Sequence, residues 1–196
     1  FIGTGYHGHT FPGAAWPFGQ VQLSPDNGTQ GWDWCSGYHY SDSVLAGFSH
    51  LHLSGTGIGD LADISFLPVT KEVVFKEGEK NSDFVRRYAG RYTHDREEAE
   101  PGYYSVILSD SDIKAELTVT ERAGMHRYTF PETGIKTLII NLGFAINWDK
   151  PYKTIINQPD DRLVTGMRLS TGWAADQHVY FAARFSQPVI SSEIAE

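Results

Sequence analysis

The sequence predicts an all-β fold, a large antiparallel β-sandwich with little helix. Apolar and polar residues alternate with a period of two over many short segments after about residue 100, and Gly, Pro, Asn and Asp separate these segments. The length of 196 residues fits one domain, because all-β sandwiches often reach about 200–250 residues. We therefore expect residues 1–196 to form a single β-sandwich domain.

The second half carries the clearest strand pattern. Between residues 113 and 120, Ile, Ala, Leu and Val alternate with Lys, Glu and Thr, which is typical of a half-buried strand. Several short strands at this spacing indicate a sandwich. The expected strands are residues 103–109, 113–120, 125–130, 136–142, 162–170 and 178–186.

The first half has fewer strand signals and more loop. Strands are expected at residues 20–24, 64–69 and 72–76, with 84–93 as a further candidate. Residues 41–50 offer a weak helical pattern. Residues 95–102 are acidic and end in Pro-Gly, which predicts a solvated turn.

Charge and composition exclude several classes of protein. The formal net charge is −8 and Lys and Arg are scattered among acids, so nucleic acid is not an expected partner. No apolar run approaches the roughly 18 residues of a membrane helix. The single cysteine cannot form an internal disulfide and therefore indicates no compartment. The start at Phe1-Ile2-Gly3 lacks both Met and a signal peptide, so we expect a targeting segment to have been removed.

Chemically active residues concentrate in the first sixty positions. Five of the eight histidines lie there, more than an even distribution would place, and long loops with such residues are usually functional. An aromatic content of 13% also suits contacts with the apolar faces of sugars. The residues concerned are His7, His9, Trp16, Trp32, Trp34, Cys35, His39, His50 and His52.

Two histidine pairs have the i, i+2 spacing that places both rings on one face of a strand. His7 with His9, and His50 with His52, would then offer paired imidazoles to a transition metal. The alternative is that the rings hydrogen-bond the backbone or sugar hydroxyls. Because no third or fourth ligand follows at a known spacing, we favour hydrogen bonding and assign no metal ligand.

Two further motifs have an ordinary structural explanation. Cys35 with a nearby His and Asp33 or Asp42 would make a thiol nucleophile, but a lone cysteine is more often a small buried hydrophobic residue. Residues 55–60 (GTGIGD) resemble a phosphate loop. However, Asp60 replaces the last glycine of that motif and no βαβ unit surrounds it, so a backbone turn is expected.

Trp32, Asp33 and Trp34 form the most sugar-like group of residues. An indole face stacks on the C–H side of a pyranose, while an indole N–H or a carboxylate binds a hydroxyl. In extended backbone both Trp rings would lie on the same side. We expect at least one of the two rings to be exposed.

Six sequence blocks resemble the N-terminal part of glycoside hydrolase family 92, and the resemblance runs from Phe1 to about Phe185. The blocks also follow the order and spacing of that family. They are FIGTGYHGHTFPGAAWPFGQVQLSPD, GWDWCSGYHYSD, GFSHLHLSGTGIGDLADISFLP, EPGYYSVIL, ERAGMHRYTFP and GWAADQHVYFAARFS.

The resemblance implies an inverting, calcium-dependent exo-α-mannosidase that trims terminal mannose from glycans. Its N-terminal sandwich, of the galactose-mutarotase-like type, would precede an (α/α)₆ catalytic barrel absent from this chain. Inversion needs a carboxylic acid and a carboxylate base about 6.5–9.5 Å apart. The resemblance places both in the barrel, so no catalytic residue is expected here, and residues 1–196 alone should be inactive.

The resemblance also implies substrate-pocket residues in this chain. Trp34 and Cys35 match the block that faces the terminal mannose, and Trp34 is the leading contact. The loop from His7 to Phe11 is expected to line the same pocket. Calcium prefers oxygen ligands, and most of its ligands would lie outside this chain. The full set of candidate contacts is Trp34, Cys35, Trp32, His7, His9, Phe11, His50 and His52.

Two other hypotheses remain open at this stage. In the first, the chain is an independent carbohydrate-binding module with an open Trp platform. In the second, it is a Cys/His hydrolase. The favoured hypothesis expects the missing barrel of the same polypeptide and mannose-containing glycans as partners, with secreted or periplasmic localisation. It also predicts an exposed apolar patch with Trp and His at its centre.

Overall fold

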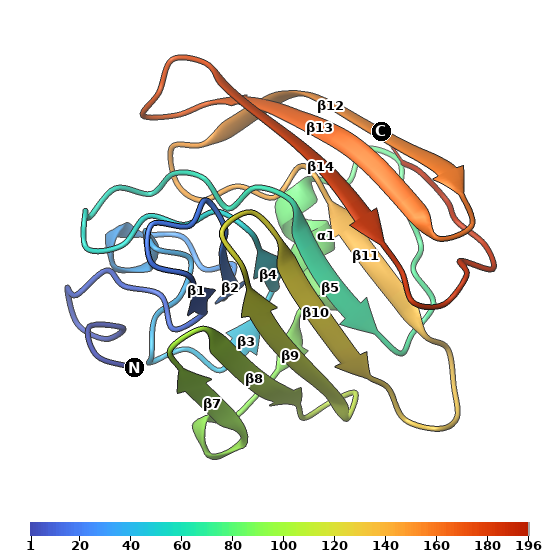
Figure 1. Ribbon diagram of the computed structural model, residues 1–196, viewed down its shortest axis with the longest axis horizontal. Coiled ribbons are helices and arrows are strands. Elements are labelled where there is room, and N and C mark those ends of the chain that lie inside the picture. The colour runs from blue at the N-terminus through green and yellow to red at the C-terminus, as the bar shows by residue number, and fades with distance from the viewer. Residues whose placement is uncertain (196) are drawn as a thin grey trace.

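The computed structural model describes residues 1–195 and has the expected mostly-β architecture (Figure 1). All strand pairs are antiparallel within this part of the chain. The five-stranded sheet has the order β1 (Ala14–Ala15), β2 (Gln22–Asp26), β4 (Gly47–Ser49), β5 (Ser65–Val69) and β11 (Thr137–Asn141). The four-stranded sheet has the order β10 (Gly124–Thr129), β9 (Ile113–Val119), β8 (Tyr103–Leu108) and β7 (Glu97–Glu100).

Two smaller sheets and a few helical turns complete the described chain. The three-stranded sheet has the order β12 (Lys150–Asp160), β13 (Leu163–Thr171) and β14 (Gln177–Arg184), and a two-stranded sheet pairs β3 (Val44–Leu45) with β6 (Gly90–Arg91). The α-helix α1 (Asn81–Tyr88) is joined by 3₁₀ turns at Trp32–Trp34 and His94–Arg96. None of the helices described is long and apolar enough to cross a membrane.

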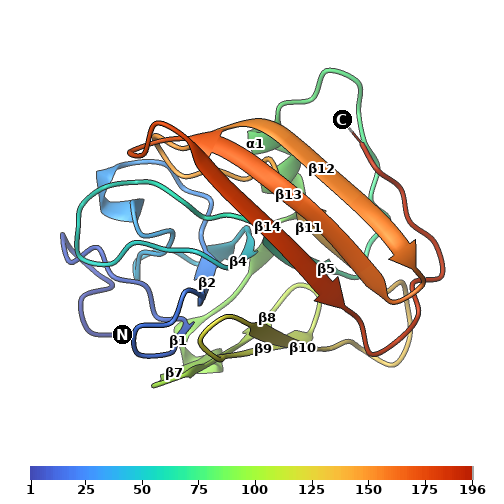
Figure 2. The same ribbon diagram turned by 45° about the horizontal axis from the view of Figure 1, so that its top comes forward.

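The sheets stack in layers that share the five-stranded sheet. Leu23 and Phe48 of that sheet pack against Tyr104 and Leu117 of the four-stranded sheet in the largest apolar core. On β5 and β11 a second core meets the three-stranded sheet, which Figure 2 shows as the orange and red layer. The result is a β-sandwich-like domain, as the sequence predicts.

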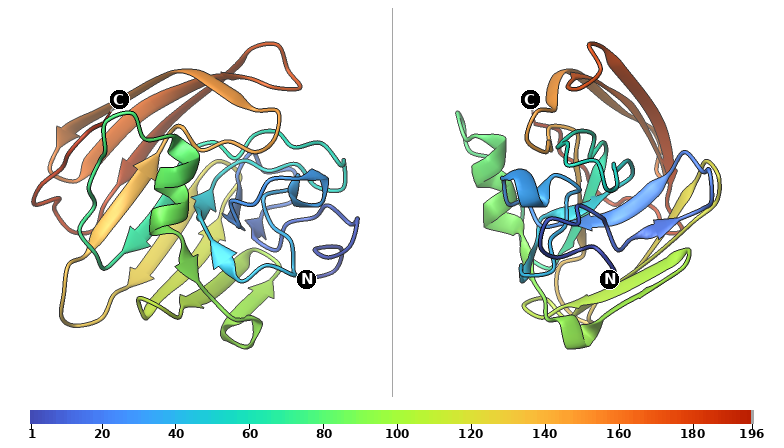
Figure 3. Two further views of the ribbon diagram at one scale, coloured as in Figure 1. Left: turned by 180° about the vertical axis from the view of Figure 1, so that it is seen from behind. Right: turned by 90° about the vertical axis from the view of Figure 1, so that its left-hand side faces the viewer.

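Helix α1 covers the opposite side of β5 and β11 from the three-stranded sheet, which the right-hand view of Figure 3 shows. Phe84 and Tyr88 of the helix pack with Leu67 and Ile139 in a small apolar cluster. Two arginines in the last helical turn lie where the helix dipole favours positive charge. The helix is only eight residues long, so tertiary packing must supply most of its stability.

Several local predictions were wrong, each for a physical reason. Residues 72–76 are not a strand, and residues 41–50 form β3 and β4 in place of a helix. The candidate 84–93 is the end of α1 followed by β6. Residues 95–102 contain the edge strand β7 over four residues, whose acidic side chains suit the edge of a sheet, and only Pro101-Gly102 forms the expected turn. The sequence analysis missed β12, an edge strand with two prolines and mostly exposed side chains.

Candidate functional site

Loops gather at the end of the molecule that lies on the left in Figure 1. They include the first thirteen residues, the connections 27–43 and 50–64, and the segment 142–149. Backbone hydrogen bonds tie them together: Gly55 N–H donates to His9 O at 2.6 Å, and Trp148 N–H donates to Gly59 O at 3.0 Å. The polar residues of the first sixty positions therefore meet segments that are distant in sequence.

Four side chains, which we call the surface cluster, meet where two of these loops touch: His7, His9, Trp32 and Asp33. Nδ1 of His7 donates to Oδ1 of Asp33 at 2.6 Å, and Nε2 of His9 lies 3.5 Å from the same oxygen. The Trp32 ring lies 5.1 Å from the ring of His7 and 4.3 Å from that of His9. The indole N–H donates to Gly57 O at 3.0 Å, which fixes the ring.

Backbone geometry explains why His9 points into this cluster. His9 has a φ of 54°, in the left-handed region that non-glycine residues seldom adopt. The turn before it is equally tight, because a Cβ on Gly8 would come within 2.1 Å of Gly3 O. Glycine at position 8 thus allows two histidines to follow one another around a sharp turn, and the expected strand face is absent.

The hydrogen bond from His7 holds the pKa of the Asp33 carboxyl below its ordinary value, although partial burial opposes the shift. Asp33 therefore stays ionised well into the acid range. His7 is exposed, whereas His9 is only 7% exposed. The surface cluster presents a carboxylate and an imidazole to solvent above a buried imidazole.

A groove of about 440 Å³ adjoins the surface cluster. Trp32 and Trp148 line it and are 58% and 60% exposed. Asn147 holds one side in place: its amide donates to Gly31 O at 3.0 Å, and its backbone N–H donates to the Gln30 side chain at 3.0 Å. Two exposed indoles beside a carboxylate suit an apolar sugar face with nearby hydroxyls.

A second hollow of about 520 Å³ lies near the turn between β13 and β14. Its lining includes Trp173, which is 61% exposed, and Gln177. Trp148, Asn147 and Trp173 are not among the site residues that the sequence predicts. A tryptophan within a loop rich in Gly, Asn and Asp could have indicated these positions, because binding residues are concentrated on loops.

The two tryptophans of the WDW motif do not share a face, so that prediction was wrong. Trp32–Trp34 is a 3₁₀ helix, in which residues i and i+2 point about 120° apart around the axis at three residues per turn. Trp34 is half-buried, donates to Asp42 at 3.2 Å and packs 4.8 Å from the His39 ring. Trp32 is the exposed ring that faces the groove.

Cys35 lies beneath this turn and is 2% exposed. Burial raises the pKa of its thiol, which disfavours the thiolate that a nucleophile needs. Cys35 is therefore a small buried residue, and it lines neither of the two hollows described above. This geometry argues against a thiol hydrolase, and the predicted contact of Cys35 with sugar stays a prediction.

The second histidine pair is internal and does not present two rings on one face. Nδ1 of His50 donates to Ile64 O at 2.7 Å, and Nε2 of His50 lies 3.0 Å from Nε2 of His126. Burial lowers the pKa of His50 to about 4. The two rings therefore form no paired metal site, and both bind backbone carbonyls, which is the alternative that the sequence analysis favours.

His52 and Phe11 belong to the same interior. Nδ1 of His52 donates to Gln22 O at 2.8 Å, and Nε2 lies 2.9 Å from the Asp26 carboxylate, with both side chains buried. The Phe11 ring is half-buried and packs 5.3 Å from the His52 ring. These two predicted site residues stabilise the loops from within and are not at the groove.

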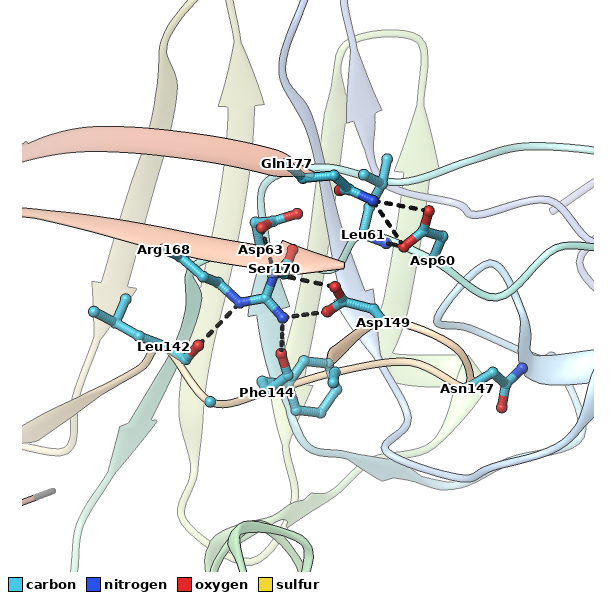
Figure 4. A network of polar contacts seen from close by, with 12 residues as sticks. Asp60, Leu61, Asp63, Leu142, Phe144, Asn147, Asp149, Arg168, Ser170 and Gln177 are labelled. Carbon is cyan, nitrogen blue, oxygen red and sulfur yellow. Dashed lines mark hydrogen bonds and ion pairs between the residues drawn. The ribbon is translucent and has the colours of Figure 1, made fainter. Parts of the chain in front are cut away.

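A second group of charges, which we call the inner cluster, lies below the loops (Figure 4): Arg168, Asp63 and Asp149. The guanidinium of Arg168 contacts Asp63 at 2.5 Å and forms an ion pair with Asp149. It also donates to Leu142 O and Phe144 O at 2.9 Å, which holds the segment 142–149 against β13. Burial raises the pKa of both carboxyls, although Arg168 opposes that shift.

Calcium does not fit the donor groups that this chain brings together. Among residues 1–195, the group of metal-binding side chains that meet is His7, His9 and Asp33, which offers two nitrogens for one carboxylate. Calcium takes six to eight oxygen ligands. The buried carboxylates Asp63 and Asp149 are occupied by Arg168. The expectation that most calcium ligands lie elsewhere in a longer enzyme stays a prediction.

Comparisons with known proteins place this geometry in a family. A family GH92 α-mannosidase from Bacteroides thetaiotaomicron has a known structure in complex with mannoimidazole. This chain superposes on it with a TM-score of 0.88 and 40% sequence identity over 96% of the chain. An inverting mannosidase from the same organism matches with a TM-score of 0.74 and 29% identity over 94% of the chain. The chain covers 25% and 23% of these two proteins.

A relative from Arthroderma benhamiae, described as an uncharacterized secreted glycosidase, is 31% identical over 138 residues. The match covers 69% of this chain and 17% of that protein. The family model for the glycosyl hydrolase family 92 N-terminal domain matches residues 1–196. The chain therefore belongs to the glycosyl hydrolase family 92 N-terminal domain family, whose solved neighbours here are α-mannosidases.

Proposed function

We propose that this chain is the substrate-facing N-terminal domain of an exo-α-mannosidase, and that its loop end forms one wall of the mannose site. The observation that carries the proposal is the match over 96% of the chain to an α-mannosidase whose structure contains mannoimidazole. Because the chain spans about a quarter of that protein, the activity belongs to a longer polypeptide.

The chemistry of the groove supports this role. Trp32 and Trp148 offer exposed indole faces for the C–H side of a pyranose, and Asp33 offers a carboxylate for hydroxyls. Trp34 is half-buried behind the same turn, and its indole is held by Asp42. In our proposal Trp32 makes the direct contact, and Trp34 fixes the turn that carries it.

The catalytic acid and base are assigned to the part of the enzyme outside this chain. Inverting hydrolysis needs two carboxyl groups about 6.5–9.5 Å apart on opposite sides of the scissile bond. Asp33 is already bound to His7, and Asp42 and Asp60 are engaged by neighbouring hydrogen-bond donors. The remaining loop carboxylates, Asp63 and Asp149, are paired with Arg168. Calcium, when bound in the complete enzyme, would hold sugar hydroxyls; this chain shapes the wall opposite them.

Exposed aromatic side chains support docking of a second domain at the loop end. A domain interface within one polypeptide buries apolar surface that the separate chain leaves in water. Tyr6 and Tyr40 are exposed in the same loops, and Trp16 and Phe18 are exposed in the connection between β1 and β2. We therefore propose an (α/α)₆ catalytic domain as the partner, and secretion or periplasmic export as the setting for a glycan substrate.

The role of Trp32 in the proposed wall of the mannose site can be tested with the Trp32→Ala variant of the complete enzyme. We expect kcat/KM on an aryl α-mannoside or a mannobiose to fall about tenfold, since one stacked ring contributes up to about 1.5 kcal/mol. Tyr180→Ala is the matched control, because this exposed ring lies on β14, outside the groove residues. Equal losses in the two variants would contradict the assignment.

The isolated chain gives a second test. Residues 1–196 should release no mannose from an aryl α-mannoside with or without calcium, because the acid and base are missing. Titration of mannobiose into the same chain distinguishes a wall from a module. Tight binding by the chain alone would favour an independent carbohydrate-binding module over our proposal.

A further inference from the structure

His9 carries one of the buried polar atoms at the loop end that have no hydrogen-bond partner within residues 1–195, and Asp63 Oδ2 is another. Nε2 has no hydrogen-bond partner among residues 1–195, although the side chain is only 6% exposed. A buried polar atom without a partner costs about 1–3 kcal/mol, so such an atom in a folded protein calls for a ligand. Nε2 points at Asp33, 3.5 Å from its Oδ1.

We propose that His7, His9 and Asp33 bind one Zn²⁺ ion. Each residue offers one ligand atom, and the three atoms lie within 4.8 Å of one another. The sequence supplies only the i, i+2 pair of histidines. The fold adds the missing third ligand from a loop 24 residues further along the chain. This site is inferred from side-chain geometry alone, and it shares Asp33 with the groove chemistry proposed above.

The two ligand separations that involve Asp33 are close to those of a small tetrahedral ion. Two ligands, each about 2.1 Å from zinc at a tetrahedral angle, lie about 3.4 Å apart. The His9–Asp33 separation of 3.5 Å already meets this requirement. The His7–Asp33 contact of 2.6 Å contains a shared proton that the ion would replace, with a lengthening of under about 1 Å. His7 is exposed, so its side chain has room to move by that amount.

The surroundings hold the ligands before an ion arrives. Trp32 packs edge-on against His9 at 4.3 Å and is itself tied to Gly57 O. Gly55 N–H binds His9 O, which fixes the backbone of that ligand. Preorganised ligands lose little conformational entropy on binding, and an overall charge of −8 favours cations.

The donor set selects the type of ion. Two imidazoles with one carboxylate suit zinc and neighbouring transition metals, whereas calcium requires more oxygens. Three protein ligands leave a fourth position for water, and the exposure of His7 and Asp33 opens that position to solvent. The result would be an open zinc site at the edge of the groove.

The test is competition for Zn²⁺ between the 196-residue chain and a chromogenic chelator at pH 7.5. We expect one ion per chain with a dissociation constant at or below about 10 µM. His9→Gln and Asp33→Asn should each weaken binding at least 100-fold. His178→Gln is the matched control, because His178 also contacts an aspartate, Asp176, at 3.0 Å but belongs to no group of three ligands.

Two measurements make the outcome decisive. Near-ultraviolet circular dichroism shows whether each variant keeps the parent fold, and Co²⁺ absorption reports coordination directly, because imidazole–carboxylate ligation gives visible bands. Absence of 1:1 binding by the folded parent would overturn the proposal. So would binding that His9→Gln leaves unchanged, since a His7–Asp33 pair alone would then account for it.

Discussion

The inner and surface clusters are built from similar side chains but differ in how their polar atoms are used. In the inner cluster, Arg168 is fully buried and donates to two carboxylates and two backbone carbonyls. In the surface cluster, the Asp33 carboxylate lies beside two histidines. It bonds to His7, whereas His9 Nε2 has no hydrogen-bond partner within residues 1–195. The first arrangement satisfies the donors of Arg168 and leaves Asp63 Oδ2 without a partner deep in the interior, whereas the second leaves a buried nitrogen beside ligand atoms that solvent can reach.

This difference separates residues that hold the loops from residues that those loops present. Arg168 joins β13 to the segment 142–149, which carries Trp148 into the groove. The surface cluster lies on the groove side of the same loops. Substitutions in the inner cluster should therefore reduce stability, and substitutions in the surface cluster should reduce binding while the fold persists.

The largest effect is expected from Arg168→Met. Removal of the guanidinium leaves Asp63 and Asp149 buried without a counter-charge, and breaking a buried ion pair in this way costs about 3–5 kcal/mol. Urea denaturation of the chain at pH 7 would measure this loss in the free energy of unfolding. Arg86→Met, at an exposed position in α1, should change it by less than about 0.5 kcal/mol.

A second substitution, added to Arg168→Met, identifies the cause of the lost stability. If uncompensated charge is responsible, Asp63→Asn added to Arg168→Met should restore part of the lost stability. A loss below about 1 kcal/mol for Arg168→Met would contradict the view that this cluster holds the loops. No recovery in the double variant would indicate lost packing and hydrogen bonds as the cause.

The next effect concerns pH and the internal pair of His50 and His126. The pKa of His50 falls from 6.5 to about 4 because burial disfavours its charged form, and burial also lowers the pKa of His126. The unfolded chain takes up these protons near pH 6.5 and the folded chain does not. The contribution of these neutral histidines to the free energy of unfolding is therefore complete above pH 6.5 and is lost as the pH falls toward 4.

For His50, the free energy of unfolding should fall by roughly 3 kcal/mol between pH 6.5 and pH 4, because a change of one pKa unit corresponds to about 1.36 kcal/mol. Unfolding free energies measured at intervals from pH 7 to 4 give the slope. His50→Gln should flatten it, whereas the exposed His178→Gln should not. An unchanged slope in His50→Gln would mean that His50 is free to titrate in the folded protein.

The strands with regular alternation could be predicted from the sequence, because their pattern reports burial on one face. The segment 113–120 is β9, within one residue. β12 could not be predicted this way, since most of its side chains are exposed and two are prolines. Helix α1 depends on contacts of Phe84 and Tyr88 with β5 and β11 that no local pattern reveals.

For the site, the sequence identifies residue types and the fold decides their roles. His7, His9 and Trp32 come together, whereas His50, His52 and Phe11 turn inward, although all six lie within the same sixty residues. Spacing alone could not distinguish the two histidine pairs, because a left-handed residue at position 9 sets the first pair. The contact of Asp63 with Arg168 spans 105 positions and has no local signal.

A smaller effect on stability is expected in the surface cluster. Asp33→Asn removes a partly exposed ion pair with His7, and such pairs contribute little to folding. The Tm should stay within about 2 °C of the parent. Differential scanning fluorimetry without added metal provides the measurement. A drop as large as that of Arg168→Met would remove the distinction between the two clusters.

The smallest effect is expected when thiol reagents are added to the folded chain, because Cys35 should hardly react. Cys35 is covered by the turn that carries Trp34, and burial raises its pKa, so little thiolate is available at neutral pH. A disulfide reagent such as dithiobis-nitrobenzoate at pH 8 should react with the folded chain at least about 100-fold more slowly than with the chain in urea. Fast labelling of the folded chain would show that the turn opens readily. That result would reopen the hypothesis of a thiol nucleophile, since Asp33 and the histidines of the surface cluster adjoin the same turn.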